Sequence, residues 1–200
     1  MRVSKQKAAE NRQHILNAAA RLFRERGISA TGVDSITDDA GLTHGAIYSQ
    51  FGSKEAIAVE SIRLALGDSK RSWQRTAEQT GGKKVFAAIV EAYLSPKHRD
   101  RPGRGCLIAA LGGDISRQPR SVRDAFTAAF KDALETLSEL IRNDDDSISS
   151  EDALAAFASM AGALMLARAV SDEAFSGLIL EAAAKWITRS AKSKRPRPAT

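Results

Sequence analysis

The side chains best placed to do chemistry lie in one short stretch of the 200-residue chain. They are Thr43, His44, Gly45, Tyr48, Ser49 and Lys54. Hydroxyl, imidazole, phenol and ammonium groups donate hydrogen bonds to phosphate oxygens and to base edges, and a glycine lets the backbone come close to its ligand. These residue types are suited to contacts with a nucleic acid, provided that the fold presents them on one face.

Two short helices with a tight turn between them are predicted to position this stretch. Apolar periodicity predicts helices over about 33–40 and 43–50, and Gly41 lies in the turn between them. A helix-turn-helix places the N-terminal residues of its second helix at base edges in the major groove. Ile47 is expected to pack inward against Ile36, which leaves His44, Gly45, Tyr48 and Ser49 on the outer face.

A longer helix is predicted to follow this motif. Ser53 is its expected N-cap, and Glu55 lies in its first turn, where the helix dipole favours a carboxylate. Lys54 stands beside the free backbone N–H groups of that turn, so we expect it to clamp a phosphate.

Helical periodicity continues along the rest of the chain, and strand signals are nearly absent. The stripe Ile15, Ala19, Leu22 and Phe23 predicts a first helix that stops at Gly27. Later helices are predicted over 83–94, from about 106, over 119–142, 151–169 and 172–190, with Ser150 and Ser171 as caps of the last two and a loop over 95–105. The predicted fold is all-α, with about nine helices: an N-terminal three-helix helix-turn-helix domain and a larger C-terminal helical bundle.

Composition sets the broad class. Hydrophobic residues make up 43% of the chain and charged residues 27%, which suits a packed core. No apolar run approaches the roughly 20 residues of a membrane span, the N-terminus lacks a signal-peptide pattern, and the single cysteine fits a reducing compartment. We therefore expect a cytoplasmic protein with no membrane partner.

The formal charge of +6 is concentrated at the two ends. Residues 1–26 hold seven basic and two acidic residues, a net charge of +5, and residues 185–200 hold six basic residues and no acidic one. Either end can follow a phosphate backbone, but solvated helix faces and a loose tail explain the same charges equally well.

Catalytic and metal-binding patterns are not found. His14, His44, His98 and Cys106 do not assemble a metal-ligand cluster, and no nucleophile–base pair or glycine-rich phosphate loop is present. We expect no catalytic residues, no metal and no cofactor, and therefore no enzyme.

The run GLTHGAIYSQFGSKEAI places a glycine, an apolar residue and a small hydroxyl residue before G-x-aliphatic-Tyr, and then Phe and Ser-Lys-Glu. This pattern resembles the TetR/AcrR family of transcription regulators. The upstream run NRQHILNAAARLFRERGISATGVDSIT resembles that family's first helix and the entry to its second. The resemblance is dense over residues 11–66. Over 67–200 it rests on the number and order of helices and on RGCLIAALGGDISRQPRSVRDAF, which is similar to one subgroup of the family.

The resemblance implies a role for each matching position. Tyr48 and Lys54 match phosphate contacts, and Thr43, His44 and Gly45 match positions that meet bases or the adjacent backbone. Ser49 and Gln50 replace bulkier residues, which implies shorter or water-mediated contacts. Gly32 stands where many members have a hydroxyl cap, so Thr31 or the bare amide is expected to replace that phosphate contact. The carboxylates of Asp38 and Asp39 suggest that their face of the second helix points away from DNA.

The resemblance also implies a homodimer and an effector pocket. The last two helices would form the dimer interface, through Leu154, Phe157, Leu164, Leu178, Ala182 and Trp186. A pocket for a small effector would be lined by Trp73, Phe86, Tyr93, Cys106, Leu107, Leu111, Phe126, Phe130, Phe157, Met160 and Met165. Plain core packing explains the same apolar residues.

The resulting hypothesis is a sequence-specific DNA-binding regulator, a ligand-released repressor that acts as a homodimer on a palindromic operator. Residues 1–53 would form the DNA-binding domain, 54–190 the effector and dimerisation domain, and 191–200 a basic disordered tail. Three alternatives stay open: an activator or nucleoid-type binder, a regulator switched by oxidation or alkylation of Cys106, and a helical-bundle small-molecule carrier that does not bind DNA.

Overall fold

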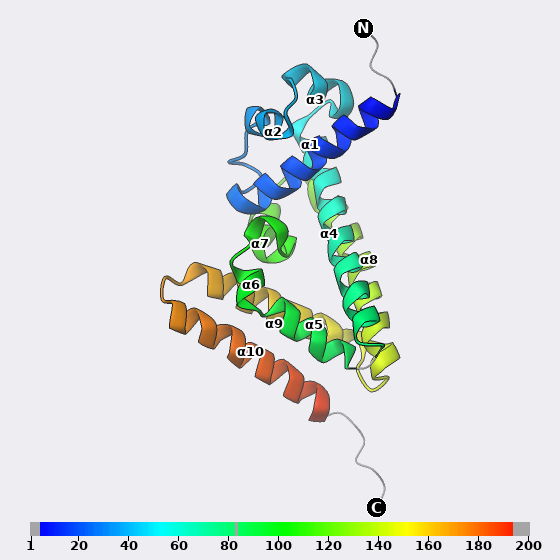
Figure 1. The fold of residues 1–200 in the computed structure, drawn as a ribbon, viewed down its shortest axis with the longest axis vertical. Coiled ribbons are helices and arrows are strands. Elements are labelled where there is room, and N and C mark those ends of the chain that lie inside the picture. The colour runs from blue at the N-terminus through cyan, green and yellow to red at the C-terminus, as the bar shows by residue number, and fades with distance from the viewer. Residues whose placement is uncertain (1–4, 83, 194–200) are drawn as a thin grey trace, which may run out of the picture. The chain divides into compact units, whose positions relative to one another are not determined.

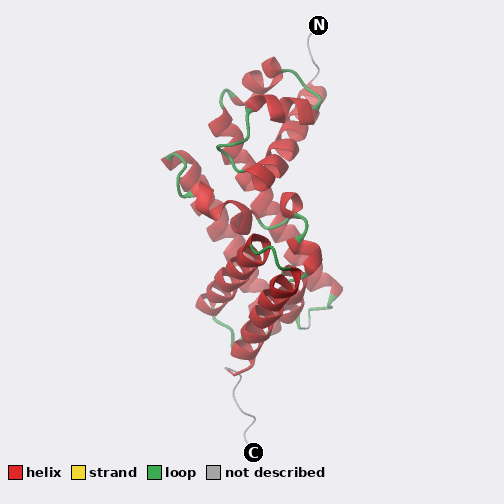
Figure 2. Cartoon of the chain, turned by 90° about the vertical axis from the view of Figure 1, so that its left-hand side faces the viewer, coloured by secondary structure: helices red, strands yellow, loops and turns green. Residues whose placement is uncertain are grey.

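The structure is a computed structural model that describes residues 5–82 and 84–193. Within those ranges the chain forms ten α-helices and one 3₁₀ helix and no strand (Figures 1 and 2). The predicted all-α fold is therefore confirmed, with ten helices where about nine were expected. The basic tail was predicted for 191–200, and its residues 194–200 lie outside the described part.

The chain packs as two compact units, one of residues 1–67 with 102–130 and the other of 68–101 with 131–200. Two long helices, α4 (Lys54–Gln79) and α8 (Arg120–Asp144), each contribute to both units. The predicted division after residue 53 separated DNA binding from effector binding and dimerisation, whereas these two units are defined by packing. The functional division therefore stays a prediction.

The first unit is built around α1 (Lys5–Arg26). The predicted apolar stripe of α1 is buried, with Ile15 and Ala19 fully enclosed. The helix stops before Gly27, as predicted, and the φ of 89° at Gly27 suits a residue without a side chain. The other helices of this unit are α2 (Val33–Ala40), α3 (His44–Phe51), the start of α4, η1 (Pro102–Arg104), α7 (Leu107–Ile115) and the start of α8.

Hydrogen bonds between distant residues explain why residues 102–130 belong to the first unit. Arg24 donates from Nε and Nη2 to the Gly103 carbonyl, at 2.9 and 2.6 Å, and the Ile28 amide donates to Asp114 Oδ2 at 2.5 Å. Gly103 lies so close to α1 that a Cβ there would come within 2.9 Å of Glu25 Cδ. The end of α1 is thus fastened to η1 and α7.

The second unit contains the rest of α4 and α8 and four helices of its own. These are α5 (Val85–Tyr93), α6 (Pro96–Arg99), α9 (Ser150–Ala169) and α10 (Glu173–Ser193). The helices α9 and α10 lie side by side (Figure 1).

The segment 95–105 was predicted as a loop, and that prediction is wrong. It holds α6 and η1. Ser95 caps α6 by accepting a hydrogen bond from the His98 amide at 3.2 Å, and Pro96 occupies the first helical position, where its missing N–H costs nothing. The prolines were interpreted as breakers although Pro96 begins a helix.

Two predicted caps are displaced by one residue. Ser149, not Ser150, caps α9 in a capping box with Asp152. Asp172, not Ser171, caps α10, since its Oδ1 accepts from the Phe175 amide at 2.9 Å. In both cases the side chain that reaches the first free amides decides the cap.

The helix α9 also corrects the expectation about membrane spans. Its 20 residues are long and apolar enough to cross a bilayer by length and composition. The core helix of a soluble protein passes the same test, and α9 buries Phe157, Met160 and Leu164 inside the second unit.

A polar cluster lies inside the second unit around His98. Its Nδ1 is 2.7 Å from the Tyr93 carbonyl, and the Tyr93 and His98 rings meet edge to face at 4.7 Å. Arg168 donates to the carbonyls of His98 and Arg99, at 2.8 and 3.0 Å, and so closes the C-terminal end of α6. Burial holds the pKa of His98 below its ordinary value of 6.5. The positive charge of Arg168 lowers the pKa further, and the hydrogen bond with the Tyr93 carbonyl acts in the opposite direction.

We expect this burial to make the second unit sensitive to acid. Since the folded-state pKa of His98 is lowered, its contribution to stability is fully present above 6.5 and is lost as the pH falls through the folded-state pKa. The variant H98Q, whose side chain does not ionise, should lose less stability than the wild type between pH 8 and pH 5. Urea unfolding followed by tryptophan fluorescence measures this, because Trp73 and Trp186 both lie in the second unit.

The matched control is H14Q, since His14 is exposed on α1. It should follow the wild-type pH dependence. Parallel loss of stability in H98Q and the wild type would contradict the assignment.

Candidate DNA-binding surface and pockets

Packing behind the α2–turn–α3 segment sets the orientation of α3. Ile36 of α2 and Ile47 of α3 are both fully buried. Gly41 ends α2 in the left-handed conformation (φ 65°), and the Leu42 amide donates to the Thr37 carbonyl at 3.0 Å. The predicted helix-turn-helix and the inward packing of Ile47 are therefore confirmed.

The face of α3 opposite Ile47 is exposed. Its exposed residues are His44, Gly45, Tyr48 and Ser49, and Thr43, the residue just before the helix, is exposed as well. The Tyr48 side chain is 54% exposed, although a phenol ring normally gains by burial. Ser49 turns its hydroxyl back onto the Ala46 carbonyl, at 3.0 Å. Gln50, at the edge of this face, is only half-buried.

Thr31 corrects one expectation. It is fully buried, and its hydroxyl donates to the carbonyls of Gly27 and Leu22, at 2.7 and 3.4 Å. In this conformation the side chain cannot reach a phosphate, so it does not replace a hydroxyl cap. Gly32 is exposed at the N-cap of α2, where it offers backbone groups only.

The start of α4 presents a cation beside free helix amides. Ser53 caps the helix as predicted, its Oγ accepting from the Ala56 amide at 3.1 Å. Lys54 donates to the Ser29 carbonyl at 3.2 Å. Since an ammonium group has three donors, this bond leaves Lys54 able to reach a further acceptor.

Arg12 has a structural role that the sequence did not reveal. It donates to the Gln50 carbonyl at 2.7 Å, pairs with Glu60 of α4, and lies 4.1 Å from the centre of the Phe51 ring. One guanidinium thus joins α1 to the C-terminal end of α3 and to α4. Its partners lie 38 to 48 residues away in sequence, so spacing gave no signal of it.

The acidic residues of α2 are partly neutralised by neighbouring helices. Asp39 pairs with Arg21 of α1, and this hydrogen bond is the main reason why the pKa of the Arg21 guanidinium is raised. Arg21 also donates to Glu25, at 2.8 Å. On the other side of α2, Asp34 pairs with His44.

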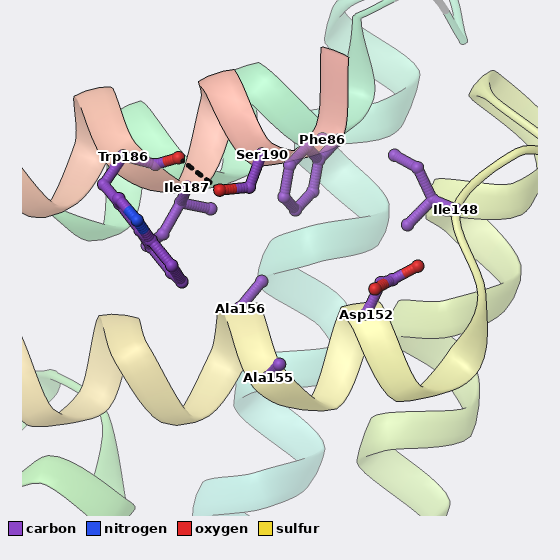
Figure 3. A pocket seen from close by; sticks show the side chains of 8 residues that line it. All are labelled: Phe86, Ile148, Asp152, Ala155, Ala156, Trp186, Ile187 and Ser190. Carbon is purple, nitrogen blue, oxygen red and sulfur yellow. Dashed lines mark hydrogen bonds between the residues drawn. The ribbon is translucent and has the colours of Figure 1, made fainter. Parts of the chain in front are cut away.

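A pocket of about 100 Å³ lies in the second unit (Figure 3). It is lined by Phe86, Ile148, Asp152, Ala155, Ala156, Trp186, Ile187 and Ser190. The alanines of α9 leave space opposite the α10 side chains, and Asp152 supplies a carboxylate at one end. Of these residues, only Phe86 was among the predicted effector residues, and Trp186 was predicted for the dimer interface instead.

The eleven predicted effector residues are divided between the two units. Six lie in the second unit (Trp73, Phe86, Tyr93, Phe157, Met160, Met165) and five in the first (Cys106, Leu107, Leu111, Phe126, Phe130). In the second unit the Phe157 ring meets the rings of Trp73 and Tyr93 at 5.8 and 6.0 Å. The prediction that Met165 lines the effector pocket is wrong, because Met165 is 52% exposed and does not line an interior.

The predicted interface residues on α9 and α10 behave in two ways. Leu154, Leu178, Ala182 and Trp186 are exposed, which leaves them available to a partner. Phe157 and Leu164 are buried inside the unit, so their assignment to an interface is wrong. The sequence analysis instead missed Leu166 and Phe175, which are exposed large apolar side chains.

Cys106 is buried at the position just before α7. Across the described residues, no three side chains of His, Cys, Asp or Glu lie together as metal ligands.

Comparisons with known proteins agree with this architecture. The family model "Bacterial regulatory proteins, tetR family" matches residues 15–60, and "Tetracyclin repressor-like, C-terminal domain" matches residues 82–183. The transcriptional repressor DhaR of Mycobacterium sp. (strain GP1) is 30% identical over 126 residues, 60% of each chain. The regulator AcrR of Shigella flexneri is 48% identical over 64 residues, 32% of this chain and 30% of its own.

A solved structure extends the likeness to nearly the whole chain. The TetR transcriptional regulator from Chloroflexus aurantiacus J-10-FL matches with a TM-score of 0.73 and 25% identity, over 94% of this chain and 96% of that one. The sequence matches to DhaR and AcrR, in contrast, span less than two thirds of those relatives' length.

We expect the Arg12 contacts to stabilise the first unit. R12A should lower the free energy of unfolding by about 1–2 kcal/mol, since it removes charge-assisted hydrogen bonds from a half-buried site. R12K keeps the charge beside Glu60 but loses the planar group over Phe51, so it should recover only part of the loss. Urea unfolding followed by circular dichroism measures both.

R26A is the matched control, because it removes the same charge from an exposed position on the same helix. If R12A and R26A were equally stable, the contacts of Arg12 would contribute nothing.

Proposed function

We propose that this chain, which belongs to the tetR family of bacterial regulatory proteins, is a homodimeric repressor that a small effector releases from a palindromic operator. Membership of the family makes it a DNA-binding transcription regulator and not an enzyme. The names of two relatives, the repressors DhaR and KstR2, support the choice of repressor over activator. We assign the protein to the cytoplasm, where its DNA lies.

The DNA contacts proposed for α3 rest on one observation. Ile47 is fully buried behind α3, while Tyr48 and His44 are exposed on the side where a major groove would lie. Tyr48 and Lys54 would contact phosphates and fix the register of the complex. The residues proposed for bases or the adjacent backbone are Thr43, His44 and Gly45, with shorter contacts from Ser49 and Gln50 and a backbone contact at Gly32.

The proposed dimer uses the outer faces of α9 and α10. Large apolar side chains are exposed there in an unusual concentration: Leu154, Met165, Leu166, Phe175, Leu178 and Trp186. A soluble chain gains by covering such a patch, at roughly 25 cal/mol for each Å² of apolar surface removed from water. A two-fold axis would also supply the second recognition helix that a palindrome requires.

The proposed effector site lies in the second unit, which holds both the pocket beside Phe86 and the packed rings of Trp73, Tyr93 and Phe157. An effector would release DNA only to the extent that it binds the non-binding conformation more tightly. The burial of Cys106 does not favour a regulator switched by that thiol.

Variants at the DNA-facing positions test the proposed contacts. The probes are a duplex enriched from a randomised library by the wild-type protein and a shuffled duplex of the same composition, measured by fluorescence anisotropy over a range of salt concentrations. K54A should weaken both complexes and reduce the slope of log affinity against log salt by about one, because one phosphate contact is lost. Y48F should weaken both duplexes alike.

T43V and H44A should instead change the preferred sequence, because base contacts carry the discrimination. K97A, an exposed lysine of the second unit, is the control and should change neither duplex. Equal losses on both duplexes for all four variants would refute the division into phosphate and base contacts.

A charge placed in the apolar face tests the dimer. Leu178 is 57% exposed, and L178E would bring two carboxylates into the proposed two-fold interface. The wild type should sediment as a dimer at micromolar concentration and L178E as a monomer with unchanged helix content. Q74E, on the exposed face of α4, is the charge-matched control. A dimeric L178E would contradict the proposed interface.

A further inference from the structure

The acidic residues of α2 are unexpected in a helix-turn-helix. The first helix of that motif crosses the DNA backbone, where a carboxylate meets phosphate repulsion. Asp34, in the first turn of α2, has a side chain that is 78% exposed. Unlike Asp39, which pairs with Arg21 of α1, Asp34 pairs with a residue of the recognition helix itself.

That partner is His44, the first residue of α3. Its Nε2 meets Asp34 Oδ1, so the pair joins the two helices across the turn. Both side chains are exposed, His44 by 53%, and an exposed contact of this kind between an imidazole and a carboxylate adds little to stability. The angle between α2 and α3 is already fixed by the buried Ile36 and Ile47. The pair is therefore not needed for folding.

The pair does restrict the recognition surface. With Nε2 held by Asp34, the imidazole has a fixed direction, and Nδ1 is the ring nitrogen left for another partner. The neighbouring Tyr48 ring lies 6.4 Å away, centre to centre. If His44 turned away, Asp34 would face the DNA without a partner, and the complex would be weakened by repulsion.

We propose that Asp34 is a specificity-determining positioning residue, which holds His44 in its DNA-reading orientation and penalises complexes in which His44 is displaced. The inference rests on the proposed role of His44 at the DNA. According to this proposal, Asp34 is necessary for the preference for one DNA sequence over others, although its negative charge opposes binding to DNA of any sequence.

The test compares D34N, H44A and the double variant on the enriched duplex and the shuffled duplex. D34N should tighten binding to shuffled DNA, because repulsion is removed, and should reduce the preference for the enriched duplex by about tenfold, the scale of one base contact. In the H44A background, D34N should leave the preference unchanged, because Asp34 acts through His44. The melting temperature of D34N should fall only slightly, because the helix dipole favours a carboxylate in the first turn of α2.

D38N is the matched control, since Asp38 is an exposed carboxylate on the same helix. It should shift both affinities by the same factor and leave the preference intact. A preference that falls equally in D34N and D38N, or that falls further when D34N is added to H44A, would overturn the inference. A library from which the wild type enriches no sequence would instead defeat the proposed function itself.

Discussion

The burial of Ile47 in α3 and of Ile36 in α2 is the constraint on which the proposed DNA-facing surface depends. Helices of eight residues, such as α2 and α3, are too short to be stable in water alone. Each fully buried isoleucine contributes about 1.5–3 kcal/mol, one on each of the two helices. The burial of Ile47 that stabilises α3 as a helix therefore also decides which of its faces is exposed.

Three arginines of α1 serve this framework. Basic residues of 1–26 were expected either to follow a phosphate backbone or to lie on solvated faces. In the structure Arg12 closes the end of α3, Arg21 neutralises Asp39, and Arg24 holds Gly103. Three guanidinium groups thus position backbone and carboxylate groups of neighbouring elements.

Local sequence signals predicted the elements well. The α1 stripe, the Gly41 turn and the Ser53 cap depend on residues within one or two helical turns of each other, and the structure has all three. The wrong predictions came where local signals conflict. In 95–105, two prolines and two glycines suggested a loop, although Pro96 after Ser95 is also a good helix start.

Contacts between distant residues could not be predicted, and α9 shows why for its faces. Its residues are apolar nearly all round, so periodicity does not separate the side that packs inside the unit from the side that stays exposed. Phe157 and Leu154 lie three positions apart and look alike in sequence, yet one is buried and the other exposed. The difference comes from neighbours such as Trp73 and Tyr93, far away in the chain, whose rings surround Phe157. A helix with two apolar faces can pack in a core on one side and leave the other for a partner, and only the tertiary structure distinguishes them.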